Sequence, residues 1–478
     1  MSETEFTLKT ILANPRQACE LRWPQAGDLD TRCNAVSALI DAINALKPAL
    51  KNKKNEKQEC ARDFGRIKNQ GGDIEAQKAL MQRIASELDS IEQKLRELEA
   101  QLLNLFAPDE VARKPFPPRF DSRADIAASL AHIIAIDDSE QAAWDAYVDG
   151  HLQASLYHTY RWRTVIEQSF GHECFYLAAK DDQQKICGVL PLMRLRSRLF
   201  GDFAISVPFF NYGGPLADNA QISAQLLAHA AEIAKNLHLK HLEIRATHSL
   251  NADPTTKAWP ARTDKASMIR RLPRTSEQLD EEIGAKVRAQ IKRARQEDIE
   301  IRAGQLELLD DFYRVFAINM RDLGTPVYGK NFFRNILTAF PQQAHIVSVR
   351  LRGKPVAAAF LLGHRDMMEI PWASTLRSVN ALNMNMLLYR AVLGFTIEQG
   401  YPFFDFGRST IDSGTYRFKR QWGAQPLQHY WHYWQPNDAE LPALKPDSPK
   451  FKLMIAAWQQ LPVAISKLIG PHIVKYLP

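Results

Sequence analysis

An acidic and a basic side chain stand close together where a short apolar segment ends. Phe403-Phe-Asp-Phe406 has the composition of a buried strand, and Asp405 and Arg408 flank Gly407 at its end. Functional groups often lie at the C-terminal ends of strands in α/β folds. A carboxylate there could act as a general base that accepts a proton from a substrate. In the alternative interpretation, Asp405 pairs with Arg408 or Arg417 and only fixes the loop.

A proline interrupts the preceding apolar segment and leaves two more candidate residues beside it. Glu369 and Trp372 lie on either side of Ile370-Pro371, where a strand is expected to be interrupted because proline cannot donate to a sheet ladder. These two residues are candidates for lining a substrate cleft. In the alternative interpretation, Trp372 is a core aromatic residue.

Basic residues also recur on a helix predicted over residues 281–297. One face of it would suit the phosphates of a substrate, and a solvated helix face is the equal alternative. The residues on that face are Arg288, Lys292 and Arg295. Two histidines, His429 and His432, alternate with aromatic residues along a predicted strand. They are interpreted as sheet packing, since no third ligand for a metal is evident.

Helix and strand patterns occur twice in the same order between residues 126 and 436. Each cycle runs strand, strand, strand, helix, strand, which predicts two similar α/β halves. The predicted strands and helices include 174–179, 185–194, 220–238, 241–245, 306–322, 330–340, 345–362 as a hairpin, 367–372, 383–399 and 403–406.

The first 107 residues have a different pattern, with few aromatic residues and prolines. Apolar residues recur at alternating steps of four and three, which is the coiled-coil period. These residues are Leu80, Ile84, Leu88, Ile91, Leu95, Leu98, Leu102 and Leu105. A weaker seam runs through Val36, Ile40, Ile43, Leu50, Ala61 and Phe64. A turn at 68–73 separates them, so we expect two long helices folded back on each other.

The first of these helices is basic. Between Lys47 and Lys68 there are eight Lys or Arg and three acids, a surplus of five positive charges. The segment is either a solvated helix face or an arm that lies along a phosphate backbone. The candidate nucleic-acid contacts are Lys47, Lys51, Lys53, Lys54, Lys57, Arg62 and Arg66.

Composition and length limit the remaining possibilities. The chain has 478 residues and a net charge of +7, no apolar run long enough to span a bilayer, and five widely spaced cysteines without a CxxC motif. We therefore expect a cytoplasmic protein without a zinc site or a disulfide framework. Residues 108–125 contain four prolines and are predicted to form a linker. Residues 451–478 are apolar, with three lysines and no acid; they either pack on the body or dock on an anionic membrane.

The N-terminal region resembles the tRNA-binding arm of seryl-tRNA synthetases. The resemblance covers about residues 25–110 and is carried by the basic segment 46–55, Gly65-Arg-Ile-Lys-Asn-Gln-Gly-Gly-Asp73 and the leucine seam ending at 105–108. It implies a tRNA-binding arm. Because no synthetase catalytic domain follows, serylation itself is not implied.

Residues 125–478 resemble FemAB-related proteins associated with exosortase/PEP-CTERM and exopolysaccharide systems. The motifs that carry this resemblance are Tyr157-His-Thr-Tyr-Arg-Trp162, Pro208-Phe-Phe-Asn-Tyr-Gly-Gly-Pro215, Glu369-Ile-Pro-Trp-Ala-Ser374, Phe404-Asp-Phe-Gly-Arg-Ser-Thr410 and Gly414-Thr-Tyr-Arg-Phe-Lys-Arg-Gln-Trp-Gly-Ala424. The implied fold is α/β (α+β), with two GNAT-like acyltransferase domains in tandem after a long antiparallel helical hairpin. The expected divisions are 1–107 hairpin, 108–125 linker, 126–270 first domain, 271–305 basic connecting helix, 306–436 second domain and 437–478 amphipathic tail.

The resemblance also implies an activity and assigns residues to it. FemAB-like proteins transfer an acyl group, often an aminoacyl group from charged tRNA, to an amine. By resemblance, Lys419 stabilises negative charge, Phe418 and Tyr416 shape the pocket, and Tyr328 lies near the acceptor. The competing interpretation of the segment around Lys419 is a surface strand on which charged residues alternate.

We therefore expect an acyltransferase that acts on an amine of a cell-envelope or exopolysaccharide precursor. Its donor would be aminoacyl-tRNA or acyl-CoA, with no bound cofactor and no metal. One alternative is an acyl-CoA-dependent GNAT enzyme that uses the arm for homodimerisation. The other is a non-catalytic assembly factor of an exopolysaccharide/PEP-CTERM system.

Overall fold

The computed structural model describes residues 8–23, 29–70, 74–106, 131–198, 200–250, 259–436 and 449–477. It divides into two compact units, Met1–Pro115 and Phe116–Pro478. The predicted linker, 108–125, and the start of the predicted tail, 437–448, lie outside the described residues.

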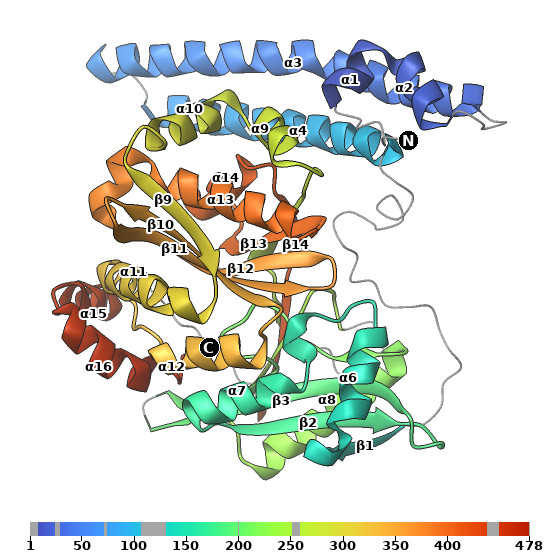
Figure 1. Ribbon diagram of the computed structural model, residues 1–478, viewed down its shortest axis with the longest axis vertical. Coiled ribbons are helices and arrows are strands. Elements are labelled where there is room, and N and C mark those ends of the chain that lie inside the picture. The colour runs from blue at the N-terminus through green and yellow to red at the C-terminus, as the bar shows by residue number, and fades with distance from the viewer. Residues whose placement is uncertain are drawn as a thin grey trace. The chain divides into compact units, whose positions relative to one another are not determined.

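The N-terminal unit is helical, as expected (Figure 1). Its helices are α1 (Leu8–Ala13), α2 (Pro15–Arg22), α3 (Leu29–Gln70) and α4 (Ile74–Phe106). The two long helices α3 and α4 pack against each other, and the short helices α1 and α2 pack at one end of the pair. The core at that end is made by Ile11, Ala18, Cys19, Val36, Ile40, Ile43, Leu102 and Phe106.

The predicted leucine seam is only partly buried. Ile84 and Leu88 are 2% and 6% exposed, whereas Leu80 and Leu105 are 42% and 38% exposed. The buried core is thickest where α1 and α2 add a further layer, because a two-helix pair alone leaves the flanks of each seam residue open to water.

The second unit contains two sheets that confirm the predicted pair of similar halves. The first sheet has the strand order β1 (His132–Ala135), β2 (Glu173–Lys180), β3 (Ile186–Ser197), β4 (Gly201–Ile205), β6 (Leu242–Ala246), β15 (Tyr430–Trp434) and β7 (Ala261–Arg262), with β5 (Leu216–Ala217) beside β3. The second has the order β9 (Ile299–Gly304), β10 (Ala344–Leu351), β11 (Lys354–His364), β12 (Met367–Thr375), β13 (Phe403–Thr410), β8 (Lys265–Arg271) and β14 (Gln425–Gln428). In both sheets one pair of neighbours is parallel, β4 with β6 and β12 with β13.

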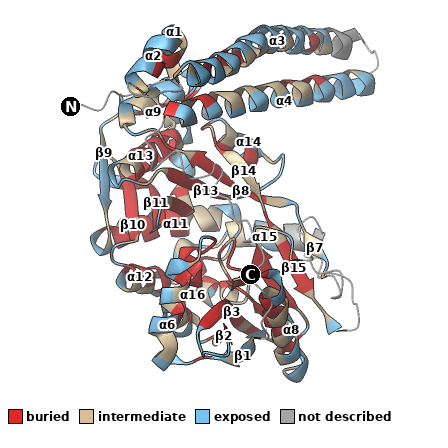
Figure 2. Ribbon diagram, turned by 90° about the vertical axis from the view of Figure 1, so that its right-hand side faces the viewer, coloured by how far each residue is buried: buried red, intermediate tan, exposed pale blue. Residues whose placement is uncertain are grey.

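Equivalent helices accompany the two sheets. The first half has α6 (Gln141–Gly150), α7 (Arg161–Phe170) and α8 (Ala220–Asn236), and the second has α11 (Leu309–Leu323), α12 (Lys330–Ala339) and α13 (Met384–Glu398). One hydrophobic core joins α6, α7, α11 and α12 to the facing sides of both sheets, and α7 packs on α12. The outer face of the first sheet is covered by α8 (Figure 2), and that of the second by α13 with α10. The two halves therefore share one interior.

Each half receives a strand from the other. Strand β8 follows the first half in sequence but pairs with β13, and β15 follows the second half but pairs with β6. The expected boundary at residue 270 thus cuts through β8, and β15, placed in the expected second domain, lies in the first sheet. Position in the sequence does not predict the sheet of a strand when a long connection leads that strand to the other sheet.

Two local expectations differ from the structure. The helix predicted over 281–297 is two helices, α9 (Ser276–Glu282) and α10 (Ala285–Ala294), because Ile283 and Gly284 have extended backbone angles. The segment around Lys419 is not a strand but a helix, α14 (Gly414–Arg420), which begins where the Ser413 hydroxyl accepts a hydrogen bond from the Tyr416 amide.

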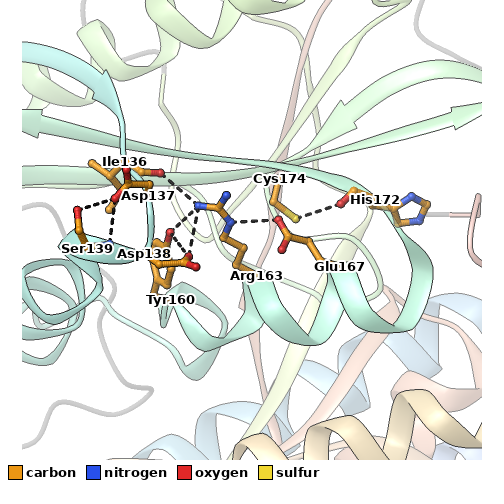
Figure 3. Close-up of polar contacts among 9 residues, drawn as sticks. All are labelled: Ile136, Asp137, Asp138, Ser139, Tyr160, Arg163, Glu167, His172 and Cys174. Carbon is orange, nitrogen blue, oxygen red and sulfur yellow. Dashed lines mark hydrogen bonds and ion pairs between the residues drawn. The ribbon is translucent and has the colours of Figure 1, made fainter.

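In the first half, Arg163 links α7 to the segment that follows β1 (Figure 3). Arg163 on α7 donates to Glu167 at 3.1 Å and to the main-chain oxygen of Ile136 at 3.3 Å, and it also donates to the hydroxyl of Tyr160. These contacts tie α7 to the segment that follows β1, so they hold the helix on its sheet.

The uneven burial of the leucine seam predicts that alanine substitutions along it lower the stability of the helical unit by different amounts. Replacing Ile84 by alanine is expected to cost about 2–4 kcal/mol because the residue is buried, whereas Leu80→Ala should cost less than about 1 kcal/mol. Thermal unfolding followed by circular dichroism measures both. Equal losses for the two variants would contradict the burial pattern.

Candidate functional site

The parallel strands β12 and β13 stay paired for only three residue pairs. The pairs are Met367–Phe403, Met368–Phe404 and Glu369–Asp405. Beyond them, the register of β13 on β8 shifts between Asp405 and Arg408. The last position at which β12 and β13 pair therefore places the carboxyl groups of Glu369 and Asp405 side by side.

The equivalent opening in the first half is closed by the chain itself. There β4 and β6 pair up to Ile205–Glu243, and the following segment continues along β6 with hydrogen bonds from Ser206 N to Glu243 O and from Gly213 N to Arg245 O, both 2.9 Å. Gly213 is required for this path, since a Cβ there would lie 1.9 Å from Val207.

In the second half, side chains form the hydrogen bonds to the main chain at the opening between β12 and β13. The amide of Gly407 donates to Asp405 Oδ1 at 2.7 Å, and its carbonyl accepts from Lys419 Nζ at 2.9 Å. The two halves thus have the same strands but fill the two openings differently. The first holds the main chain of 206–213, bound by the buried Arg245, which also pairs with Glu243, and the second holds Asp405 and Lys419.

Residues of the first half complete the environment of the two carboxyl groups. Tyr157 Oη donates to Glu369 Oε2 at 2.5 Å, and Asn211 Nδ2 donates to Oε1 at 3.0 Å. Tyr212 Oη donates to Asp405 Oδ2 at 3.2 Å, and its hydroxyl also hydrogen-bonds Glu369. The site is therefore built at the contact between the halves and requires both.

Burial controls the charge of the two carboxyl groups. Desolvation, followed by repulsion from Asp405, raises the pKa of Glu369 to about 8. Desolvation also raises the pKa of Asp405, although its bonds to Gly407, Ser267 and Tyr212 and the charge of Lys419 oppose this. Two buried carboxyl groups side by side resist double ionisation, so near neutral pH the pair holds one proton between them.

Lys419 supplies the counter-charge. It is buried at 7% exposure, and its Nζ donates to the carbonyl oxygens of Gly407 and Arg408 at 2.9 and 2.8 Å. Desolvation lowers its pKa to about 8, while Asp405 and Glu369 act in the opposite direction. The ammonium thus points into the contact between the halves and not into bulk water, and the structure brings together Lys419, Asp405 and Glu369.

Three other predicted site residues serve packing. Trp372 lies in an aromatic cluster with Phe210, Phe333 and Phe360, as the alternative interpretation placed it. Tyr416 is buried in the core of the second half, and Phe418 packs against that core, with its ring 5.0 Å from that of Tyr389. Tyr416 and Lys419 are three residues apart and lie on the same buried side of α14, whereas Phe418 is half-buried.

Arg408 and Tyr328 lie farther along the same contact between the halves. The Arg408 side chain is exposed, and its guanidinium carbon is 4.7 Å from the centroid of the Trp431 ring, while that of Arg245 is 4.3 Å from the same ring. Tyr328 is half-buried, and burial raises its pKa to about 12. Asp405 does not pair with Arg408, so the loop-fixing alternative is wrong for that pair.

Sequence reasoning missed the partners that the first half provides. Tyr157, Asn211 and Tyr212 lie in motifs that carry the family resemblance, yet nothing local to them indicates carboxyl groups about 160–250 residues away. Ser267 was also missed; it bonds Asp405, and its Oγ is 2.9 Å from His429 Nε2. Burial lowers the pKa of His429 to about 3, so this ring is neutral.

The raised pKa of Glu369 predicts a pH-dependent stability. Between about pH 4.5 and 8 the folded protein holds a proton that the unfolded chain has lost, so this group makes the protein less stable as pH rises through that window. Glu369→Gln removes the titration, and its stability relative to the unmodified protein should improve between pH 5 and 9 by an amount on the order of a few kcal/mol. Melting curves at several pH values measure this, with the exposed Glu398→Gln as control. Parallel pH profiles for all three proteins would contradict the assignment.

Comparison with known proteins agrees with this architecture. Residues 284–420 match the family model described as "Acetyltransferase (GNAT) domain", a span that includes Glu369, Asp405 and Lys419. No curated protein matches the chain in sequence.

Several solved structures are similar in fold. FemX shares 14% identity, with 63% of this chain and 96% of that chain covered and a TM-score of 0.47. The C-terminal domain of a putative lysylphosphatidylglycerol synthetase from Agrobacterium fabrum shares 12% identity, with 63% of this chain and 93% of that chain covered and a TM-score of 0.43. A tandem GNAT protein from the clavulanic acid biosynthesis pathway shares 13% identity, with 65% of this chain and 100% of that chain covered and a TM-score of 0.42. Residues 284–420 form a GNAT-like domain, and the protein has two GNAT-like domains in tandem and a long N-terminal helical region.

Proposed function

We propose that the protein is an acyltransferase that moves an acyl or aminoacyl group onto an amine, with its reaction centre where β12 and β13 part. The observation that carries this proposal is the buried group of Glu369, Asp405 and Lys419 at that parting. It lies within the span that matches the GNAT model and is enclosed by residues of the first half.

The arrangement suits the proton transfers of such a reaction. The acceptor nitrogen forms a bond to the carbonyl carbon, the ester or thioester bond of the donor breaks, and the nitrogen loses a proton. A carboxyl pair that holds one proton near neutral pH retains one carboxylate, which can accept the proton from the nitrogen, directly or through water, and the pair can return a proton to the leaving oxygen or sulfur. Asp405 is the proposed base, and Glu369 sets its basicity by repulsion.

Lys419 is the proposed stabiliser of the negative charge that forms during the reaction. Negative charge develops on the carbonyl oxygen in the transition state, and a fixed ammonium in a desolvated place stabilises it strongly. Two of its three N–H donors are used on main-chain oxygens, which fixes its position and leaves one for the substrate.

Arg408 is the proposed contact for an anionic part of the substrate. It is exposed at the contact between the halves, is held against Trp431, and lies close enough to Arg245 to feel its charge. An amine-bearing envelope or exopolysaccharide precursor that carries phosphate or carboxylate would suit it.

The basic arm favours aminoacyl-tRNA as the donor and hence a cytoplasmic location. Lys47, Lys51, Lys57 and Arg62 are exposed on α3. Lys53 and Lys54 bridge to Glu87 and Glu92 on α4, so they also hold the hairpin together. The side chain of Arg66 lies outside the described residues. Acyl-CoA as donor, with the arm used for dimerisation, is the second candidate, and the assembly factor is the third.

A pair of substitutions on α14 tests the catalytic proposal. Lys419→Gln keeps a hydrogen-bond donor but removes the charge, and we expect at least a hundredfold lower turnover because the oxyanion loses its partner. Arg417→Gln, on the exposed side of the same helix, should leave turnover unchanged. The measurement is the loss of labelled acyl groups from pooled charged tRNAs and, separately, from acyl-CoAs, with melting curves as a folding control. Folded Lys419→Gln protein with unchanged turnover would remove Lys419 from the mechanism.

Charge removal on α3 tests the donor. The triple variant Lys51→Gln, Lys57→Gln, Arg62→Gln should bind aminoacyl-tRNA at least tenfold more weakly in filter binding and show a shallower dependence on salt. The matched control neutralises three exposed basic residues of the other unit, Lys185, Arg352 and Lys354. Equal affinity for the triple variant and the control would exclude the arm from donor binding.

A further inference from the structure

The C-terminal helix α16 (Val463–Val474) buries small residues and exposes large apolar ones, which is the opposite of an ordinary surface helix. Ser466, Gly470 and Val474 are buried, and they lie on one stripe because they are spaced by four. Large apolar residues lie outside this stripe: Ile465, Leu468 and Ile469 are 43%, 70% and 37% exposed. A helix of a soluble protein normally turns its large apolar residues inward.

The neighbouring helix α15 (Pro449–Gln459) extends the exposed surface. Leu453 is 72% exposed and Met454 is 56% exposed. Its next residue, Ile455, faces inward, where a Cβ on Gly324 would lie 2.4 Å from it. We call Leu453, Met454, Ile465, Leu468 and Ile469 the tail patch. Figure 1 shows both helices packed along the outer side of α11, which the contacts confirm.

The two helices are already fixed to the body, as one of the two sequence interpretations expected. A Cβ on Gly470 would lie 2.8 Å from Val327 N, so α16 approaches the main chain as closely as a glycine allows. Arg321 donates to Leu461 O at 2.8 Å, and His172 of the first half is bonded to Lys475 O at 2.7 Å. The inward face is therefore filled, and the tail patch is exposed in the docked position.

The charge around the tail patch favours one kind of partner. Residues 449–478 contain four lysines and no aspartate or glutamate. Lys467 is exposed, lies in sequence between Ile465 and Leu468, and has its Nζ 5.6 Å from the centroid of the Tyr313 ring. A segment whose own charged residues are all cations, beside exposed apolar side chains, matches the surface of an anionic bilayer, which offers hydrocarbon beneath negative headgroups. Within the described ranges, no helix is long and apolar enough to cross a membrane.

We propose that the tail patch docks the protein on the surface of an anionic membrane, with α15 and α16 lying in the plane of the interface. The large apolar side chains enter the headgroup region, and the lysines contact the negative lipids. The small inward residues let both helices stay on the body while this happens.

Vesicle sedimentation with the full-length protein tests the proposal. We expect binding to vesicles of phosphatidylglycerol and phosphatidylcholine, at least tenfold weaker binding to phosphatidylcholine alone, and at least a tenfold loss for the double variant Leu453→Asp, Leu468→Asp. Both leucines are about 70% exposed, so the fold should tolerate the change. Leu152→Asp is the matched control, since Leu152 is 67% exposed on the first half, and it should bind like the unmodified protein.

Three outcomes would overturn the proposal. The first is no vesicle binding by the unmodified protein. The second is equal binding by the double variant and the Leu152→Asp control. The third is a dimer, seen by light scattering, that the double variant dissociates while vesicle binding stays unchanged, which would assign the tail patch to a second copy of the chain. None of these outcomes depends on the acyltransferase activity.

Discussion

Two buried carboxyl groups and one buried ammonium meet where a parallel pair of strands separates. Glu369 and Asp405 are forced together by the register of β12 on β13, and water is excluded by the first half of the unit. Neither carboxylate could remain charged at this depth without a counter-charge, and an unpaired ammonium would be equally costly. The position of Lys419 on α14 is therefore coupled to the protonation of the pair, and a change in any of the three alters the other two.

The exchange of strands between the halves explains how such a group stays in place. Because β8 and β15 each cross to the other sheet, the contact between the halves is crossed by the main chain and not only by side chains. Ser267 on β8 contacts Asp405, and His429, just before β15, contacts Ser267. Relative movement of the halves would break these bonds, so the fold fixes the geometry in which the proposed proton transfers occur.

The two similar halves differ at the openings between their parallel strands. In the first half the segment 206–214 occupies the opening between β4 and β6, and it carries the Asn211 and Tyr212 side chains into the second half's site. The first opening is thus closed by the same residues that complete the second. The two halves have equivalent openings, and the segment that fills the first supports the site in the second.

The sequence alone determined the order of helices and strands, the repeat and the helical N-terminal region, because these follow from apolar periodicity and turn residues over short stretches. It also singled out Asp405 and Glu369, since charged residues stand out within apolar segments, and Lys419, through the resemblance of its motif to FemAB-related proteins. It could not determine that Trp372, Tyr416 and Phe418 face the core, because the side to which a side chain points depends on what packs against it. Nor could it show which strands exchange sheets or that Tyr157, Asn211 and Tyr212 enclose the carboxyl pair. The contacts of Tyr157, Asn211 and Tyr212 with the pair join residues about 160–210 positions apart, and only the packing of the two sheets against a shared interior decides them.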